Sequence, residues 1–262
     1  MRKDFERAYV TSHGSVAVLT LNHPEVMNAA SPTLVKGAAD ALTHIEKADS
    51  GFRAIIVTGE GRGFCSGANL SERGTQPAGV GHSLETVFHP FLRRLRDSRM
   101  PIITAVNGAA AGVGMSIALM GDLILAAKSA YFLQAFTRIG LVPDGGSTWI
   151  LPRLIGLARA KELSLLAERL PAEKALQWGL INRVHDDAEL MPEALKLAAK
   201  LAEGPTVALA ASRRLYWQSP LNTYEEQLDE ERRSQELAGS TADFMEGVAA
   251  FLQKRPAKFS GR

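Results

Sequence analysis

The chain is poor in the features that mark disulfide-stabilised, membrane-bound and nucleic-acid-binding proteins. It holds one cysteine in 262 residues, which excludes an internal disulfide framework and fits a reducing, cytoplasmic setting. No apolar run reaches the ~18 residues of a membrane-spanning helix, and no basic-then-apolar leader is expected. The formal net charge of +2, without a concentrated basic stripe, gives no reason to expect nucleic acid or a membrane surface as a partner.

Metal-ligand spacing is also missing. No cluster of histidine, cysteine, aspartate or glutamate has the spacing of a metal site, so no metal is expected. Cys65 lies between Phe64 and Ser66 with no histidine near it in the sequence, which favours a small buried thiol over a nucleophile. Apolar residues are plentiful instead, at 46% of the total beside 22% charged, and this composition predicts a globular enzyme with a large core.

The stretch 101–122 carries the first sign of chemistry. Its apolar, β-branched residues 102–106 predict a buried strand, and a helical pattern begins at Met115. Between them lie Asn107-Gly108 and a tract of small residues, 109–114, which we interpret as a turn. Backbone N–H groups at such a helix start lack partners and suit an oxygen that becomes negative during a reaction. The alternative is that the small residues only allow close packing of helix on strand.

A second glycine-rich turn has the same arrangement. Residues 54–58 predict another buried strand, which runs into the turn 59–70, GEGRGFCSGANL. Two such turns can each supply one N–H group to a single oxygen, which is how a main-chain oxyanion hole is built. The pair therefore predicts an active site that stabilises a developing negative charge.

The remaining patterns predict an α/β chain with an all-helical end. A helix is expected from Ser31-Pro32, where a hydroxyl N-cap precedes proline in the first turn. Residues 71–82 are polar and rich in glycine and proline and predict a mobile flap, and Pro90 must kink or split the helix that follows. From residue 187 onward the patterns are helical. No internal repeat of about 20–50 residues is visible.

Three segments together resemble the signature motifs of the crotonase, or enoyl-CoA hydratase/isomerase, superfamily. They are GRGFCSGANL, AVNGAAAGVGMSIALMGD and GLVPDGGSTWILPRLIG, in the family's order and spacing, and the loop HPEVMNA and the ending FLQKRPAKF extend the match over nearly the whole chain. The resemblance implies an α/β, crotonase-like ββα spiral with an all-helical C-terminal segment, acyl-CoA thioester substrates, and trimers that often pair into hexamers. It divides the chain into a core carrying the acyl-CoA site, 1–200, and a helical oligomerisation segment, 201–262.

The resemblance also places the groups that would bind the thioester. In the first motif the oxyanion N–H is that of Ala68, and in the second it is that of Val113. Asn69 stands where the family more usually has aspartate. The residues that would contact the coenzyme A part of the substrate are Val26, Met27, Ala68, Asn69, Leu70 and Lys254. No separate cofactor is implied, because coenzyme A belongs to the substrate.

Two positions depart from the hydratase pattern. Hydratases of the superfamily use two glutamates, and the aligned positions hold Ser116 and Phe136. Serine is no carboxylate base and phenylalanine has no proton to give, so ordinary hydratase chemistry is disfavoured. Asp144 remains, at the position where several isomerases of the superfamily have their acid/base. Aspartate before a helix can instead be an N-cap, but beside an oxyanion hole we interpret it as the base.

Three functions stay open at this level. The favoured one is an acyl-CoA isomerase with a main-chain oxyanion hole and one aspartate, which shifts a double bond or opens the epoxide ring of an aromatic acyl-CoA. The segments 132–153 and 238–262 most resemble such isomerases. The alternatives are an enoyl-CoA hydratase with relocated acid/base groups and a non-catalytic acyl-CoA-binding protein. Apolar faces in the helices after Pro205 and the resemblance together predict a homotrimer or homohexamer.

Overall fold

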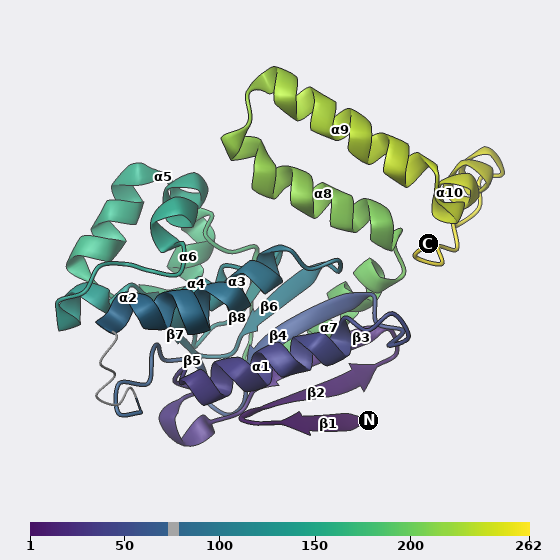
Figure 1. The fold of residues 1–262 in the computed structure, drawn as a ribbon. Helices are drawn as coiled ribbons and strands as arrows, with labels where there is room; N and C mark the ends of the chain where they lie inside the picture. The colour runs from purple at the N-terminus through teal and green to yellow at the C-terminus, as the bar shows by residue number, and fades with distance from the viewer. Residues whose placement is uncertain (73–78) are drawn as a thin grey trace.

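The computed structural model describes residues 1–72 and 79–262, in which a helical arm projects from a sheet-based core (Figure 1). Within these residues the larger sheet has seven strands in the order β1-β2-β3-β4-β6-β8-β11. The first three pair antiparallel, and all later neighbours pair parallel. These strands are Arg2–Phe5, Ala8–His13, Val16–Leu21, Ala54–Gly59, Ile102–Val106, Leu123–Ala127 and Arg183–His185.

A smaller sheet, in the order β10-β9-β7-β5, alternates with the larger one along the chain. Three strands of the larger sheet, β4, β6 and β8, are each followed by a strand of the smaller sheet and then by helix. The fold therefore repeats a strand–strand–helix unit without a repeat in the sequence. The smaller sheet consists of β5 (Gly63–Cys65), β7 (Ala109–Ala111), β9 (Tyr131–Leu133) and β10 (Leu170–Pro171).

The smaller sheet corrects the interpretation of both glycine-rich stretches as plain turns. Half of the tract 109–114 is strand β7, and β5 lies inside the stretch 59–70. Glycine allows the elements to approach closely here, since a Cβ on Gly114 would lie 2.1 Å from the Cys65 carbonyl oxygen and one on Gly108 2.1 Å from that of Arg62. The small residues thus do allow close packing, as the alternative interpretation held. The helix start that was predicted after them is also present.

Helices α1 (Pro32–Ile45) and α7 (Leu190–Ala202) pack against the larger sheet. The predicted start of α1 is confirmed, because Ser31 is its N-cap and accepts a hydrogen bond from the Leu34 N–H at 3.2 Å. The remaining helices are α2 (Gly79–Ser83), α3 (His89–Arg96), α4 (Val113–Ala118), α5 (Ser147–Leu166), α6 (Ala172–Trp178), α8 (Thr206–Gln218), α9 (Tyr224–Gly239) and α10 (Ala242–Leu252).

The segment that was expected to be a flap at 71–82 is only partly described. Residues 73–78 lie outside the described residues, and Gly79–Ser83 forms helix α2 instead of a loop. A π-helical turn, Leu84–Phe88, joins α2 to α3, and its closing bond runs from the His89 N–H to the Leu84 carbonyl. The predicted break is confirmed, since Pro90 lacks the N–H that would continue a regular helix through this point.

The C-terminal arm is all-helical, as predicted. Helices α8 and α9 lie side by side, and α9 leads back so that α10 lies near the start of α8 (Figure 1). The chain changes direction between the end of α7 at Ala202 and the start of α8 at Thr206, and the division into 1–200 and 201–262 stays a prediction. None of the helices in the described part of the chain is long and apolar enough to cross a bilayer.

A buried arginine attaches this arm to the core. The Arg213 side chain on α8 is 5% exposed and its Nε donates to Asp122 Oδ2 at 2.5 Å. Its guanidinium also donates to the carbonyl oxygens of Ser98 at 2.6 Å and Leu95 at 3.2 Å. The same Asp122 oxygen accepts a hydrogen bond from the Ile102 N–H at 2.7 Å. Asp122 therefore connects Arg213 of α8 to the first residue of strand β6.

We therefore expect Arg213→Ala to destabilise the protein strongly. Removing one partner of a buried pair leaves the Asp122 carboxylate without its cation and the Ser98 carbonyl without the Arg213 donor, a change that costs about 3–5 kcal/mol in the free energy of unfolding. Urea denaturation measures this loss. Arg214→Ala, at the exposed neighbouring position, is the matched control and should change stability by less than about 0.5 kcal/mol. Equal effects of the two substitutions would show that the buried link is not important for stability.

Candidate active site

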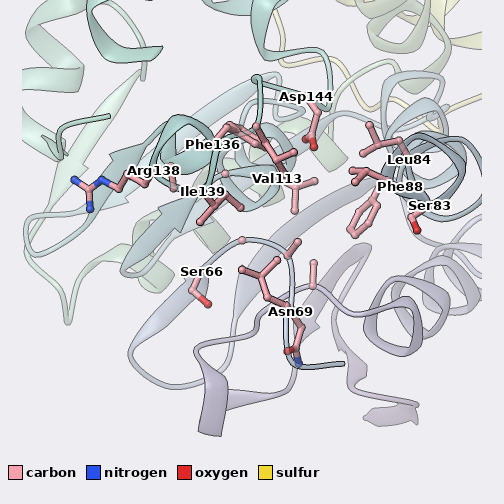
Figure 2. Close-up of a pocket in the computed structure, with 18 of the residues that line it drawn as sticks. Ser66, Asn69, Ser83, Leu84, Phe88, Val113, Phe136, Arg138, Ile139 and Asp144 are labelled. Carbon is pink, nitrogen blue, oxygen red and sulfur yellow. The ribbon is translucent and has the colours of Figure 1, made fainter. Parts of the chain in front are cut away.

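A cavity of about 260 Å³ opens where the two glycine turns meet (Figure 2). The first turn and the start of α4 form one wall, and the π-helical turn and the segment before α5 form the other. Most of the atoms that line it are apolar. The side chains that define its shape are Leu70, Leu84, Phe88, Val113, Phe136, Ile139, Leu141 and Asp144.

The two turns touch each other at glycine. A Cβ on Gly67, where φ is +111°, would lie 3.2 Å from the Ala111 carbonyl oxygen, and one on Gly112, where φ is +51°, would lie 3.8 Å from the Gly67 Cα. Both positive φ angles favour glycine. The residues that follow these glycines, Ala68 and Val113, both line the cavity.

The backbone of Ala68 faces the cavity because of the way it pairs with Ala30. The Ala30 N–H donates to the Gly67 carbonyl at 2.7 Å, and the Ala30 carbonyl accepts from the Asn69 N–H at 2.9 Å. In such a parallel bridge the peptide groups on either side of Ala68 face Ala30, so the N–H of Ala68 itself is directed the other way. Ala68 is also exposed.

The backbone N–H of Val113 belongs to the first residue of α4. The first N–H groups of a helix have no partner inside the helix, and the N-cap residue Gly112 provides no side chain to replace one. The structure thus brings Ala68 and Val113, predicted from turns about fifty residues apart, to one cavity. Their role in catalysis stays a prediction.

Asp144 lies across the cavity with its carboxyl group directed into it (Figure 2). Among the described residues that line the cavity it is the only carboxylic acid. Its Oδ1 is buried and has no hydrogen-bond partner within the described chain. Burial raises the pKa of Asp144 to about 6, against an opposing effect of His89. A carboxyl group with such a pKa can take up and release protons near neutral pH.

The alternative that Asp144 caps the following helix is wrong. Helix α5 begins at Ser147, its N-cap is Gly146, and no side-chain cap hydrogen bond is present. The carboxyl group is therefore available for chemistry, while the backbone of Asp144 has a separate role in the turn.

The two positions where hydratases have glutamates contribute no acid or base. Ser116 is fully buried beneath the turn that carries Asp144, and its hydroxyl oxygen lies 3.1 Å from the Asp144 carbonyl oxygen and 2.8 Å from the Ser147 hydroxyl oxygen. Phe136 forms part of the cavity wall, close to Gly112.

Cys65 is buried as predicted, and burial raises the pKa of its thiol to about 11. No group of three or more metal-ligating side chains occurs among the described residues.

The residues predicted to contact coenzyme A are only partly brought together. Leu70 lines the cavity and is half-exposed. Val26 and Met27 are not among the described lining residues, but their carbonyl oxygens each accept a hydrogen bond from Ser66, which does line it, at 3.0 Å. Lys254 follows α10 and is not among the described residues that line its own chain's cavity.

Asn69 has a structural role that the sequence did not reveal. Its Oδ1 accepts hydrogen bonds from the Ser71 hydroxyl at 2.7 Å and the Glu72 N–H at 3.3 Å, while its Nδ2 donates to Glu72 Oε1 at 2.9 Å. Aspartate has no donor for that last bond and would repel the Glu72 carboxylate. The amide therefore fits this loop, in which Glu72 also pairs with Arg7.

Leu84 and Phe88 line the cavity, a position that no sequence motif indicated. The π-helical turn changes the register of the side chains, because its bonds span five residues instead of four. Pro90, two residues after this turn, is the one sequence signal that a regular helix is interrupted here.

These features and the similarity to known proteins define the family. The profile of the enoyl-CoA hydratase/isomerase family matches residues 11–262, and the chain belongs to this family of enzymes. It is 44% identical over 260 residues to 1,2-epoxyphenylacetyl-CoA isomerase of Escherichia coli (strain K12), covering 97% of this chain and 99% of that one. It is 45% identical over 258 residues to a probable enoyl-CoA hydratase of Rhodobacter capsulatus, covering 97% of both.

The fold agrees with this assignment. The crystal structure of an enoyl-CoA hydratase from Bacillus anthracis is similar with a TM-score of 0.92 and 31% sequence identity, over 98% of this chain and all of that one. The architecture described above is thus the crotonase fold, a ββα spiral with C-terminal helices, as the sequence motifs implied.

The raised pKa of Asp144 predicts a pH-dependent effect on stability. The folded-state pKa of about 6 lies above the 3.8 of an ordinary aspartate, so the folded protein binds the proton more tightly than the unfolded chain and loses stability as the pH rises through this window. Asp144→Asn removes the buried charge. We expect it to stabilise the protein relative to wild type by about 1–2 kcal/mol more at pH 8 than at pH 4, measured by urea denaturation. A stability difference that does not change with pH would contradict the desolvation of this carboxyl group.

Proposed function

We propose that the protein is an acyl-CoA isomerase in which Asp144 moves a proton and the N–H groups of Ala68 and Val113 bind the thioester oxygen. The observation that carries this proposal is the lone carboxyl group of the cavity, buried on one oxygen, without a partner there, and with a pKa of about 6. A base with that pKa is mostly ionised at neutral pH, yet its conjugate acid still forms readily there, so it suits both proton removal and proton return.

The chemistry follows from these three groups. The Asp144 carboxylate removes a proton from the carbon next to the thioester of a 3-enoyl-CoA, and the electrons move onto the thioester oxygen. The N–H groups of Ala68 and Val113 stabilise this enolate-like state because they are fixed before charge develops. The carboxylic acid then returns the proton two carbons further along the chain, which leaves a 2-enoyl-CoA. No cofactor takes part apart from the coenzyme A of the substrate.

Residue content favours isomerisation over hydration. Adding water requires one group to activate the water and another to protonate carbon, and the described cavity offers one carboxyl group. Ser116 is buried with its hydroxyl occupied, and Phe136 is apolar. One of the two relatives is named an isomerase and the other a probable hydratase, so their names do not decide between the two reactions. The absence of glutamate at positions 116 and 136 is the stronger support for isomerisation. Hydration by relocated groups and binding without catalysis are the outcomes that an assay has to exclude.

The apolar walls support a hydrocarbon acyl group as substrate. Leu84, Phe88 and Phe136 surround the space beside Asp144 and would contact an aliphatic chain or an aromatic ring. The similarity to the E. coli isomerase makes an epoxide of an aromatic acyl-CoA the second substrate class to test. Outside the cavity, we propose that Val26, Met27 and Leu70 and the backbone of Asn69 contact the coenzyme A part.

We also propose that the protein assembles as a trimer or hexamer. Large apolar side chains on the arm are exposed in the single chain, among them Tyr216 at 80%, Phe251 at 83% and Leu252 at 74%. Lys254 follows directly after these residues, and in such an assembly it would reach the coenzyme A phosphates of another subunit's site.

Light scattering at micromolar concentration tests the assembly. We expect a mass of three or six times the 28.2 kDa of the chain. Phe251→Glu places a charge in the proposed interface and should shift the population toward smaller species. A wild-type monomer under these conditions would contradict the assembly and, with it, the role of Lys254.

Turnover of the Asp144→Asn variant tests the catalytic proposal. Asparagine keeps the shape but cannot accept a proton, so turnover should fall by ~10²–10⁴-fold while substrate binding is nearly unchanged. The assay follows 3-enoyl-CoA to 2-enoyl-CoA conversion and, separately, the epoxide. Asp40→Asn, the same substitution on the exposed face of α1, is the control and should keep wild-type turnover. An Asp144→Asn variant with wild-type turnover would remove the base from the proposal.

A further inference from the structure

The backbone of Asp144 is held more firmly than its side chain. Its carbonyl oxygen accepts hydrogen bonds from the Ser147 N–H at 3.1 Å and the Ser147 hydroxyl at 2.8 Å, and the Ser116 hydroxyl oxygen lies 3.1 Å from it. The carboxyl Oδ1, in contrast, has no partner within the described chain. The direction of the carboxyl group must therefore come largely from the backbone that carries it.

Ser147 is the centre of a fully buried polar cluster beneath this carbonyl. Ser116, Gln134 and Ser147 each have 0% exposure. The two hydroxyl oxygens are 2.8 Å apart, and Gln134 Nε2 donates to Ser147 Oγ at 3.3 Å. Each hydroxyl has one proton, so one consistent arrangement has Ser116 and Gln134 donating to Ser147, which donates to the Asp144 carbonyl. Ser147 is then the group whose hydroxyl connects the cluster to the turn.

Two glycines shape the turn so that it can lie on this cluster. Gly145 and Gly146 have φ angles of +61° and +84°, which allow the chain to reverse between Asp144 and α5. A Cβ on Gly145 would lie 2.6 Å from Ser116 Cβ, so the turn lies directly against Ser116. The Asp144 carbonyl consequently faces the buried serines while its carboxyl group faces the cavity (Figure 2).

We propose that Ser147, supported by Ser116, is a positioning residue that fixes the Asp144 carboxyl group in the cavity through the Asp144 backbone carbonyl. This inference rests on the proposed role of Asp144 as the base. It goes beyond that role, because it assigns a function in catalysis to two serines that do not touch the substrate. Displacement of a reacting group by about 1 Å can cost on the order of 10² in rate, so the loss of this anchor should be visible in turnover.

The experiment compares Ser147→Ala with wild type and with Ser98→Ala, a buried serine that bonds backbone groups away from the cavity. We expect Ser147→Ala to lower kcat by ~10–100-fold with KM changed less than about threefold. The acid limb of its kcat/KM profile should move to lower pH, because a loosened carboxyl group regains contact with water. Ser98→Ala should keep the kcat and the pH profile of wild type even where it lowers the melting temperature. Ser116→Ala, which removes the hydroxyl that supports Ser147, provides a milder variant if Ser147→Ala does not fold.

The same substitutions in the Asp144→Asn background separate the two proposals. If Ser147 acts through the carboxyl group of Asp144, Ser147→Ala should lower the residual turnover of Asp144→Asn less than about twofold, because residues that act as a unit are not additive. A folded Ser147→Ala enzyme with wild-type kcat and pH profile, beside an impaired Asp144→Asn enzyme, would overturn the positioning role alone. Wild-type turnover of Asp144→Asn would overturn the proposed function itself.

Discussion

The desolvation of the Asp144 carboxyl group is the constraint on which the site depends. A carboxylate in water has a pKa near 4 and is a weak base at neutral pH, whereas burial beside Phe88, Phe136 and Leu141 raises the pKa of Asp144 to about 6. Burial of this group lowers the stability of the folded state at a pH where the carboxyl group is ionised. The hydrogen bonds to its backbone carbonyl hold the residue in place in spite of that loss.

At Ala68 and Val113 the scaffold brings backbone N–H groups, rather than charged side chains, to the cavity. Each strand–strand–helix unit passes through the smaller sheet before its helix, and the close approach of Gly67 to Ala111 and of Gly114 to Cys65 leaves little room for any Cβ between the units. Main-chain N–H groups are fixed by the fold and do not titrate. They can therefore stabilise negative charge in the cavity without adding a charge that would lower the pKa of Asp144.

Much of this arrangement could be predicted from the sequence, because its signals are local. Buried strands, the start of α1 and the breaks in the arm depend on hydrophobic runs, an N-cap serine and glycine or proline positions. The convergence of Ala68, Val113 and Asp144 was predicted through motifs. The strands β5 and β7 were missed because each has only three residues, β7 all alanine and β5 beginning at glycine, and both are extended through pairing with neighbours. The role of Asn69 depends on Glu72 and that of Ser147 on Ser116, contacts that only the folded chain reveals.

The products of the wild-type enzyme test the central claim most directly. Incubation with a 3-enoyl-CoA and, separately, with the corresponding 2-enoyl-CoA in deuterated water, followed by mass spectrometry, distinguishes movement of a proton from addition of water. One carboxyl group between two carbons predicts interconversion of the two enoyl isomers, with deuterium entering carbon positions and no hydroxyacyl-CoA formed at a comparable rate. Rapid formation of 3-hydroxyacyl-CoA from the 2-enoyl substrate would contradict it, and a second acid or base would then have to act in this cavity.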